Sequence, residues 1–117
     1  MKINVREKES VIVISVDSSV LQEHVPMFRE RLNDVLAKKK YWIVFDMLDA
    51  NYISSMGISV ILAVKRKANE NGGDVLFANV NHLIMNLFEV TELVKKLEVY
   101  DNVEDAIDAL KRRMPNQ

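Results

Sequence analysis

The stretch that decides the fold is Tyr41–Leu62, which reads YWIVFDMLDANYISSMGISVIL. Its first part, Tyr41–Phe45, is a short apolar run rich in β-branched and aromatic residues that stops at Asp46, a pattern typical of a strand covered on both faces. A longer apolar run, Ile58–Val64, continues into the basic Lys65-Arg66-Lys67 and predicts a helix with a solvated basic face. The stretch therefore predicts a buried strand, a polar turn and a helix in succession.

Two serines, Ser54 and Ser55, lie where this helix should begin. A serine at that place can cap the helix by accepting a hydrogen bond from a backbone N–H two or three residues further on. The helix dipole also favours an anion there. A hydroxyl at this position therefore suits an ordinary helix cap and an acceptor for a phosphoryl group, and the residues alone leave both roles open for Ser55.

The segments before this stretch predict a hairpin and a helix. Ile3–Val5 and Val11–Val16 are two β-like runs separated by a short polar turn, and the more charged first run suits the edge of a sheet. Pro26 can occupy a first helical turn, and apolar residues then recur at helical spacing as far as Lys38. These apolar positions are Val25, Phe28, Leu32 and Val35.

The segments after it continue the alternation of helices and strands. Gly72 or Gly73 can end the central helix in a left-handed conformation. The next predicted elements are a strand at Asp74–Asn79 and a short helix marked by Val80, Leu83, Ile84, Leu87 and Phe88. A short strand follows at Leu97–Tyr100. The terminal helix carries Val103, Ile107, Leu110 and Met114, is capped by Asp101 or Asn102, and stops before Pro115. The order predicts an α/β fold with a mixed, largely parallel sheet, an N-terminal edge hairpin and about four helices, in a single domain over residues 1–117.

The composition narrows the class of protein. The chain has 117 residues, 49% of them hydrophobic and 28% charged, a net charge of −1 and no cysteine, which excludes disulfides and thiolate sites. Acidic and basic residues are interleaved along most of the chain, so we expect no nucleic-acid partner. No apolar run reaches the length of a membrane span and the N-terminus lacks the apolar core of a signal peptide, so we expect a cytoplasmic protein without a membrane partner.

Several motifs resemble those of one family, in order and in spacing. They are Asp46 at the strand end, the aromatic-hydrophobic pair Tyr52-Ile53, Ser54-Ser55-Met56-Gly57 ahead of an apolar helix, Gly72-Gly73 before a strand, and Asn86–Leu93. The chain resembles a STAS domain of the anti-sigma-factor-antagonist type over nearly its whole length. It departs from the family pattern at Ser54, where the family usually has Asp, at Met56, where a small residue is usual, and at Glu92, where glycine is usual.

The resemblance implies a partner-switching regulator. In this family the unphosphorylated antagonist binds an anti-sigma factor that is also a serine kinase of the GHKL type, phosphorylation of a serine ends the binding, and a PP2C-type phosphatase removes the phosphate. By position the phosphorylated residue is Ser55, with Ser54 as second candidate. The surface expected to bind the partner comprises Asp46, Asp49, Tyr52, Ile53, Ser54, Ser55, Met56 and Gly57.

Other functions fit less well. A STAS domain can also be a scaffold or a regulator of a target other than a sigma factor, and the sequence does not separate these. A receiver domain phosphorylated on Asp46 would need an acidic pair after the first strand, where Asp17 stands alone, and a lysine after a late strand. His24 and His82 lack metal-ligand spacing, and no phosphate loop, His-Glu-x-x-His motif or nucleophile elbow occurs. We therefore expect no catalytic activity, no functional metal and no cofactor.

Overall fold

The computed structural model describes residues 1–92 and 95–115. In chain order the elements are β1 (Ile3–Lys8), β2 (Val11–Val16), a 3-10 turn η1 (Gln22–His24), α1 (Val25–Ala37), β3 (Trp42–Asp46), α2 (Ser55–Glu70), β4 (Asp74–Ala78), α3 (His82–Val90), β5 (Val99–Tyr100) and α4 (Val103–Arg113). This succession confirms the predicted α/β fold with an N-terminal hairpin. No helix in these two ranges is long and apolar enough to cross a lipid bilayer.

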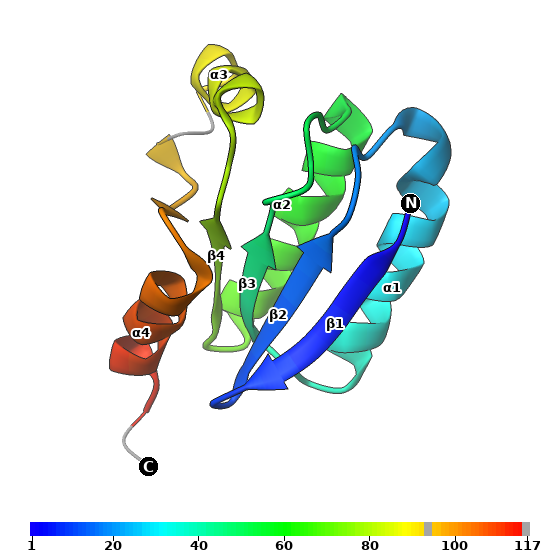
Figure 1. The fold of residues 1–117 in the computed structure, drawn as a ribbon. Coiled ribbons are helices and arrows are strands. Elements are labelled where there is room, and N and C mark those ends of the chain that lie inside the picture. Colours follow the sequence, from blue (N-terminus) through cyan, green and yellow to red (C-terminus); the bar gives the residue numbers. More distant parts are fainter. Residues whose placement is uncertain (93–94, 116–117) are drawn as a thin grey trace.

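The five strands lie in the sheet in the same order as in the chain (Figure 1). β1 pairs antiparallel with β2 at the edge, and every later neighbour pairs in parallel, as predicted for a mixed, largely parallel sheet. The last strand is shorter than predicted, because β5 pairs only with Phe77 and Ala78 at the end of β4. Leu97 lies outside this ladder and is buried in the core instead.

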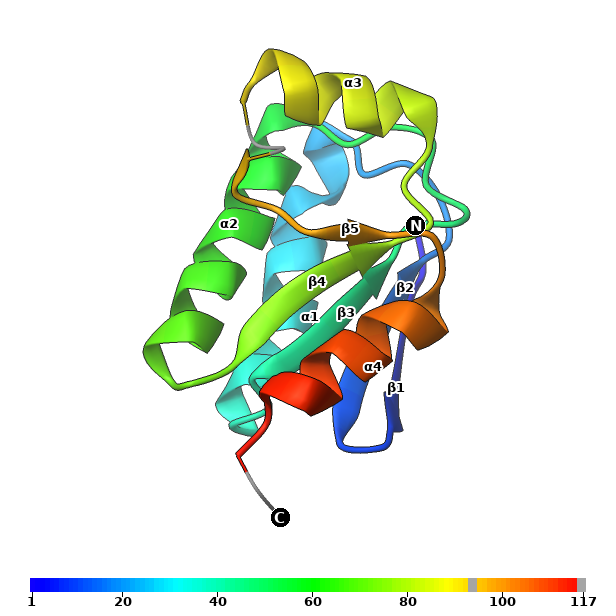
Figure 2. The ribbon, with the colours of Figure 1, turned by 90° about the vertical axis from the view of Figure 1, so that its left-hand side faces the viewer.

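Helices cover both faces of the sheet, with α1 and α2 on one face and α4 on the other (Figure 2). Alternate residues of a strand point to opposite faces. Ile12 and Ile14 of β2 accordingly join the larger core cluster under α1 and α2, whereas Val11 and Val13 join a second cluster under α4. This two-sided burial explains the uninterrupted apolar runs of the central strands. Trp42, predicted as a core residue, packs at the margin of the second cluster and is only partly buried.

The helices begin and end close to their predicted limits. α1 starts with Pro26 in its first turn, and its four predicted apolar positions are buried. The side chain of Asn102 caps α4 by accepting the N–H of Asp105 at 2.8 Å, and Ile107 and Leu110 are buried. α3 buries Ile84 and Phe88 but leaves Leu83, which the same pattern included, 63% exposed.

Lys65 is not part of a solvated helix face, which corrects the prediction for the basic run on α2. Its Nζ lies 2.6 Å from Asp74 Oδ1, and both side chains are less than one fifth exposed. Arg113 of α4 contacts the other oxygen of Asp74 at 3.0 Å and also pairs with Glu98. This charge network joins α2 on one face of the sheet to the end of α4 on the other. Arg66 and Lys67 are exposed, as predicted.

Candidate functional site

The turn at residues 52–57, called here the serine turn, begins α2 with a capped first turn. Ser54 is the N-cap: its Oγ accepts the backbone N–H of Gly57 at 3.1 Å, and the residue is only 7% exposed. The prediction that a serine caps α2 is thus confirmed, but the cap is Ser54 and not Ser55. A serine oxygen can replace the usual aspartate here because both side chains are short and carry a hydrogen-bond acceptor.

Ser55 is the first residue of α2 and is exposed. Its hydroxyl forms no hydrogen bond within the described residues, and its carbonyl oxygen accepts the hydroxyl of Ser59 at 3.1 Å. The position lies at the positive end of the helix dipole, where unpaired backbone N–H groups favour negative charge. Ser55 therefore combines an accessible hydroxyl with a surrounding that tolerates an anion.

The serine turn is fixed to the loop that follows β2. Val20 donates its N–H to the carbonyl oxygen of Tyr52 and accepts the N–H of Ser54, both at 2.8 Å. Ile53 and Val20 are buried at this bridge. A Cβ on Gly57 would lie 2.9 Å from Cγ1 of Ile53, so the glycine allows the start of α2 to pack directly against the bridge.

Asp46 connects the loops that follow β3 and β4. Its carboxylate accepts the N–H of Leu48 at 3.2 Å, the side-chain amide of Asn79 at 3.0 Å and, at a longer 3.4 Å, the hydroxyl of Ser15. Asn81 caps α3 and also donates to the carbonyl oxygen of Ala50 at 2.9 Å. These bonds hold the serine turn between two neighbouring loops.

The predicted partner-binding residues divide by exposure. Tyr52 and Met56 are 46% and 42% exposed, and Ser55 and Asp49 are also at the surface. The remaining predicted residues are buried or partly buried and shape the turn: Asp46, Ile53, Ser54 and Gly57. Contact with a partner stays a prediction, and the side chains placed to make it belong to the exposed group.

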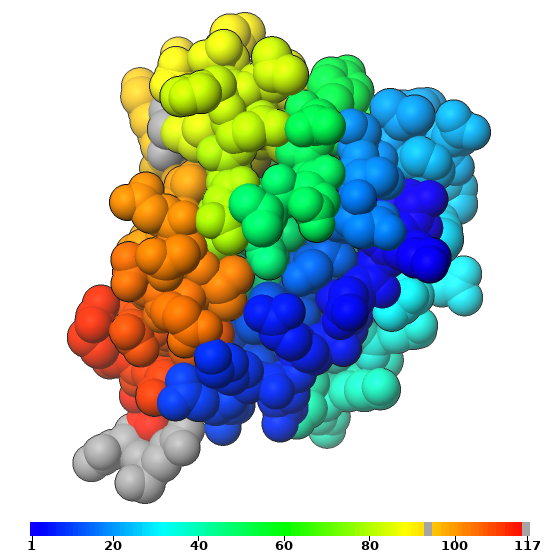
Figure 3. All heavy atoms as spheres, in the orientation of Figure 1, coloured from blue at the N-terminus to red at the C-terminus, as the bar shows by residue number. Residues whose placement is uncertain are grey.

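Three exposed apolar residues near this site were not predicted. Leu21 follows Val20, Leu48 lies in the loop after β3, and Leu83 lies in the first turn of α3; they are 39%, 65% and 63% exposed. Figure 3 shows the loop from β3 to α2, which carries Leu48, between α3, which carries Leu83, and the segment after β2, which carries Leu21. The one feature of the sequence that could have indicated their exposure is that each is an apolar residue within or next to a polar turn. Like Tyr52 and Met56, they are exposed apolar side chains, which a protein partner can cover.

Glu92 occupies the position where the family usually has glycine. Its φ of 61° lies in the left-handed region, which costs a non-glycine residue about 1–2 kcal/mol. Glycine would adopt this conformation without that cost, and this chain adopts it with a glutamate. Leu93, the last residue of the predicted motif, lies outside the described residues.

Neither histidine nor the acidic residues gather as metal ligands. No group of three or more His, Cys, Asp or Glu side chains that could hold a metal ion occurs in residues 1–92 and 95–115. His24 accepts the N–H of Leu21 on Nδ1 at 3.1 Å and so caps the 3-10 turn η1.

Comparison with known proteins places this geometry in a family. The family model of the STAS domain matches residues 2–106. The anti-sigma F factor antagonist of Paenibacillus polymyxa is 22% identical over 111 residues, which cover 94% of this chain and 95% of that protein.

Two solved structures share the fold. An anti-sigma factor antagonist from Mycobacterium paratuberculosis matches with a TM-score of 0.85 at 20% identity, over 94% of this chain and 93% of that one. The Bacillus cell fate determinant SpoIIAA, solved in its phosphorylated form, matches with a TM-score of 0.71 at 15% identity, over 92% of this chain and 98% of that one. The described fold and the match over residues 2–106 lead to one conclusion: the chain belongs to the STAS domain family.

Proposed function

We propose that this protein is a partner-switching antagonist of an anti-sigma factor. In the unphosphorylated state it binds an anti-sigma factor that is also a GHKL-type serine kinase; phosphorylation of Ser55 ends the binding, and a PP2C-type phosphatase restores it. The protein acts in the cytoplasm as a single, non-catalytic domain. The names of its relatives, which are anti-sigma factor antagonists, support this proposal.

The observation that carries the proposal is the exposed hydroxyl of Ser55, which forms no hydrogen bond within the described residues and lies in the same turn as the exposed side chains of Tyr52 and Met56. A partner that covers these apolar side chains would also cover Ser55. A phosphoryl group adds about −1.5 to −2 charges at neutral pH. Burying that charge without a counter-charge costs several kcal/mol, and a cost of about 3 kcal/mol weakens binding by more than a hundredfold.

The same position explains why phosphorylation would leave the fold intact. The N-terminus of α2 partly stabilises the added charge through its dipole and its free N–H groups. The adjacent Ser54 is unsuited to modification in the folded state, because it is buried and its oxygen already accepts the N–H of Gly57. We therefore assign the switch to Ser55 and the structural role to Ser54.

The deciding experiment identifies the partner and then varies the serines. Unmodified protein is used to capture its partner, which mass spectrometry should identify as a GHKL-type serine kinase. Calorimetric titration with the purified kinase should give similar affinities for the unmodified protein and Ser55→Ala, and an affinity at least about a hundredfold lower for Ser55→Asp. Thermal melts serve as the control, since all three proteins should melt alike.

Two results would contradict the proposal. Phosphate found on Ser54, or on no serine of this turn, after treatment with the kinase would remove Ser55 as the switch. Capture of a partner that is neither a kinase nor an anti-sigma factor would favour the alternative functions, in which the protein is a scaffold or regulates a target other than a sigma factor.

A further inference from the structure

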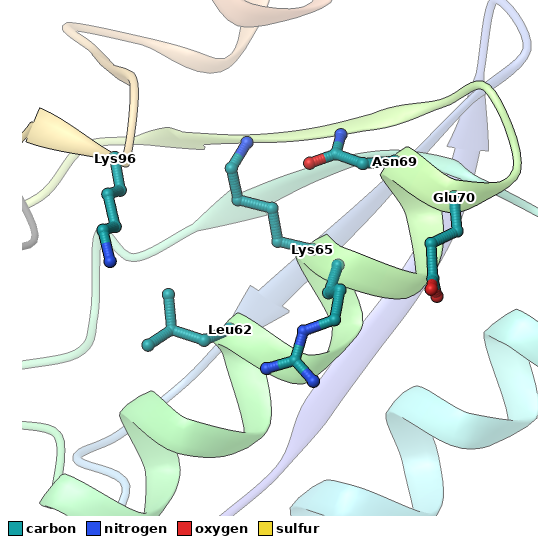
Figure 4. Close-up of a pocket in the computed structure, with 6 residues that line it drawn as sticks. Leu62, Lys65, Asn69, Glu70 and Lys96 are labelled. Carbon is teal, nitrogen blue, oxygen red and sulfur yellow. The ribbon is translucent and has the colours of Figure 1, made fainter.

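The fold separates charges that are interleaved in the sequence. Residues 25–40, residues 55–70 and the pair Lys95-Lys96 hold ten of the sixteen Lys and Arg but only three of the seventeen Asp and Glu. α1 and α2 lie together on one face of the sheet, and Lys96 lines a hollow with residues of α2 (Figures 2 and 4). We call this surface the basic face. The rest of the chain holds six basic and fourteen acidic residues, so positive and negative charges are unevenly distributed between these two parts of the chain.

The basic face contains two hollows, one on each side of α2. The first, of about 500 Å³, lies between Leu62, Arg66 and Lys96 and also includes the acidic Glu70 (Figure 4). The second, of about 420 Å³, is the groove between α1 and α2. Its floor is apolar, with Leu36, Val60 and Val64, and it is lined by Arg29 and Lys67 but by no acidic residue.

The two cations of the α1–α2 groove have no charged partner among the described residues. Arg29 and Lys67 are exposed and form no ion pair with any residue of the described ranges, whereas Lys65 of the same basic run is held by Asp74. A groove between two helices with an apolar floor and unpaired cations fits a short helix that is both apolar and acidic. Nucleic acid would satisfy the cations but has no aliphatic side chains for the floor.

One helix of this chain has that character. On α3, Leu83, Leu87 and Val90 recur at i, i+4 and i+7, and Leu83 and Val90 are 63% and 82% exposed. Residues 79–92 contain Glu89 and Glu92 and no Lys or Arg. The C-terminal end of a helix carries partial negative charge, which adds to that of these two glutamates. α3 is thus complementary in charge and in apolar surface to a groove elsewhere on the same molecule.

We propose that α3 of one copy docks in the α1–α2 groove of a second copy, with the exposed Leu83 and Val90 on the apolar floor and Glu89 and Glu92 facing Arg29 and Lys67. The contact joins two different surfaces, so it is head-to-tail and extends to a ring or a filament as concentration rises. The contact does not involve Ser55.

Sedimentation equilibrium of the full chain over a concentration series at low and high salt tests this contact. The weight-average mass should rise with concentration at low salt, and high salt should weaken association by about tenfold or more because the ion pairs are exposed. A reversal of the groove, Arg29→Glu with Lys67→Glu, and a reversal of the helix, Glu89→Lys with Glu92→Lys, should each abolish association. All four changes in one chain should restore it, which a merely unfolded variant would not do.

The matched control is Arg6→Glu with Arg112→Glu. It makes the same change in charge at two exposed residues that lie on neither surface and form no ion pair among the described residues. This variant should associate like the unmodified protein. A mass that stays monomeric at low salt, an equal loss in the control, or no recovery in the fourfold variant would each overturn the proposal. Binding of random-sequence duplex DNA by a monomer, lost on reversal of the groove, would overturn it in favour of a nucleic-acid surface.

Discussion

Ser54 caps the helix that begins at Ser55 by accepting the backbone N–H of Gly57 at 3.1 Å. The hydroxyl of its neighbour Ser55 is exposed and forms no hydrogen bond within residues 1–92 and 95–115. Two adjacent serines therefore have different roles, which can be measured separately.

Replacing each serine by alanine should have different effects on stability. Ser54→Ala removes the cap and should lower the free energy of unfolding by about 1 kcal/mol, whereas Ser54→Asp should retain most of it. Ser55→Ala, the matched control, should change it by less than about 0.5 kcal/mol. Urea denaturation followed by circular dichroism measures all three. Equal losses in the two alanine variants would show that the cap does not belong to Ser54.

The three glycines should tolerate alanine to very different degrees. At Gly73 a Cβ would lie 2.0 Å from the carbonyl oxygen of Tyr41, so backbone must move, and we expect a loss of more than about 3 kcal/mol. Gly57→Ala meets the side chains of Ile53 and Val20 and should cost about 1–3 kcal/mol. Gly72 has open space but a φ of 83°, so its alanine variant should cost about 1 kcal/mol. Thermal melts should rank the variants in this order, and a Gly73→Ala protein as stable as Gly72→Ala would refute it.

Asp46, the last residue of β3, and Asp49, in the loop that follows, should differ in their contribution to stability. Asp46→Ala leaves the N–H of Leu48 and the amide of Asn79 without their acceptor and should lower the free energy of unfolding by about 1–2 kcal/mol. Asp49 is exposed and accepts no hydrogen bond from the described residues, so Asp49→Ala should stay within about 0.5 kcal/mol. Hydrogen exchange at the amide of Leu48 provides a local readout, which should accelerate in the first variant only.

Acid should weaken the network around Asp74. Burial alone would raise the pKa of this carboxyl group, but hydrogen bonds from Lys65, Asn69 and the N–H of Val75 outweigh it and hold the pKa below the ordinary value of 3.8. The folded protein therefore binds the proton less readily than the unfolded chain, so the stabilisation is complete above about pH 4 and is lost as pH falls through the lower folded-state pKa. Urea midpoints of the unmodified protein and of Asp74→Asn should differ at pH 7 and converge at low pH. If the difference in urea midpoint between the two proteins is the same at low pH as at pH 7, the ionisation of Asp74 does not contribute to stability in this way.

Periodicity predicted the fold well because the decisive residues carry local signals. The spacing of apolar residues predicts the buried strand Val11–Val16 and the apolar face of α1. Asn102 is a typical N-cap residue and predicts where α4 begins. The cap was displaced by one residue because adjacent serines satisfy the same capping rule. Only the backbone conformation decides between them.

What the sequence could not predict depends on residues distant in the chain. The pairing of Lys65 with Asp74 and of Arg113 with the same carboxylate requires the sheet to bring three elements to one edge. The interleaved charges likewise gave no sign that α1 and α2 would collect most of the cations on one face. The exposure of Leu48 and Leu83 also followed from tertiary packing, since apolar spacing alone indicates burial.

The strand order along the chain equals the strand order in the sheet, which has a consequence for synthesis on the ribosome. Each new strand can add to the growing edge as soon as it emerges, without waiting for a distant segment, and such local pairing favours rapid folding. Among the described elements, α4 is the helix that covers the face carrying Val13, Val44 and Leu76, and it follows all five strands in the chain. The nascent chain therefore keeps an apolar sheet face uncovered until residues 103–113 have left the exit tunnel, and this interval is when it is most exposed to aggregation and to chaperones.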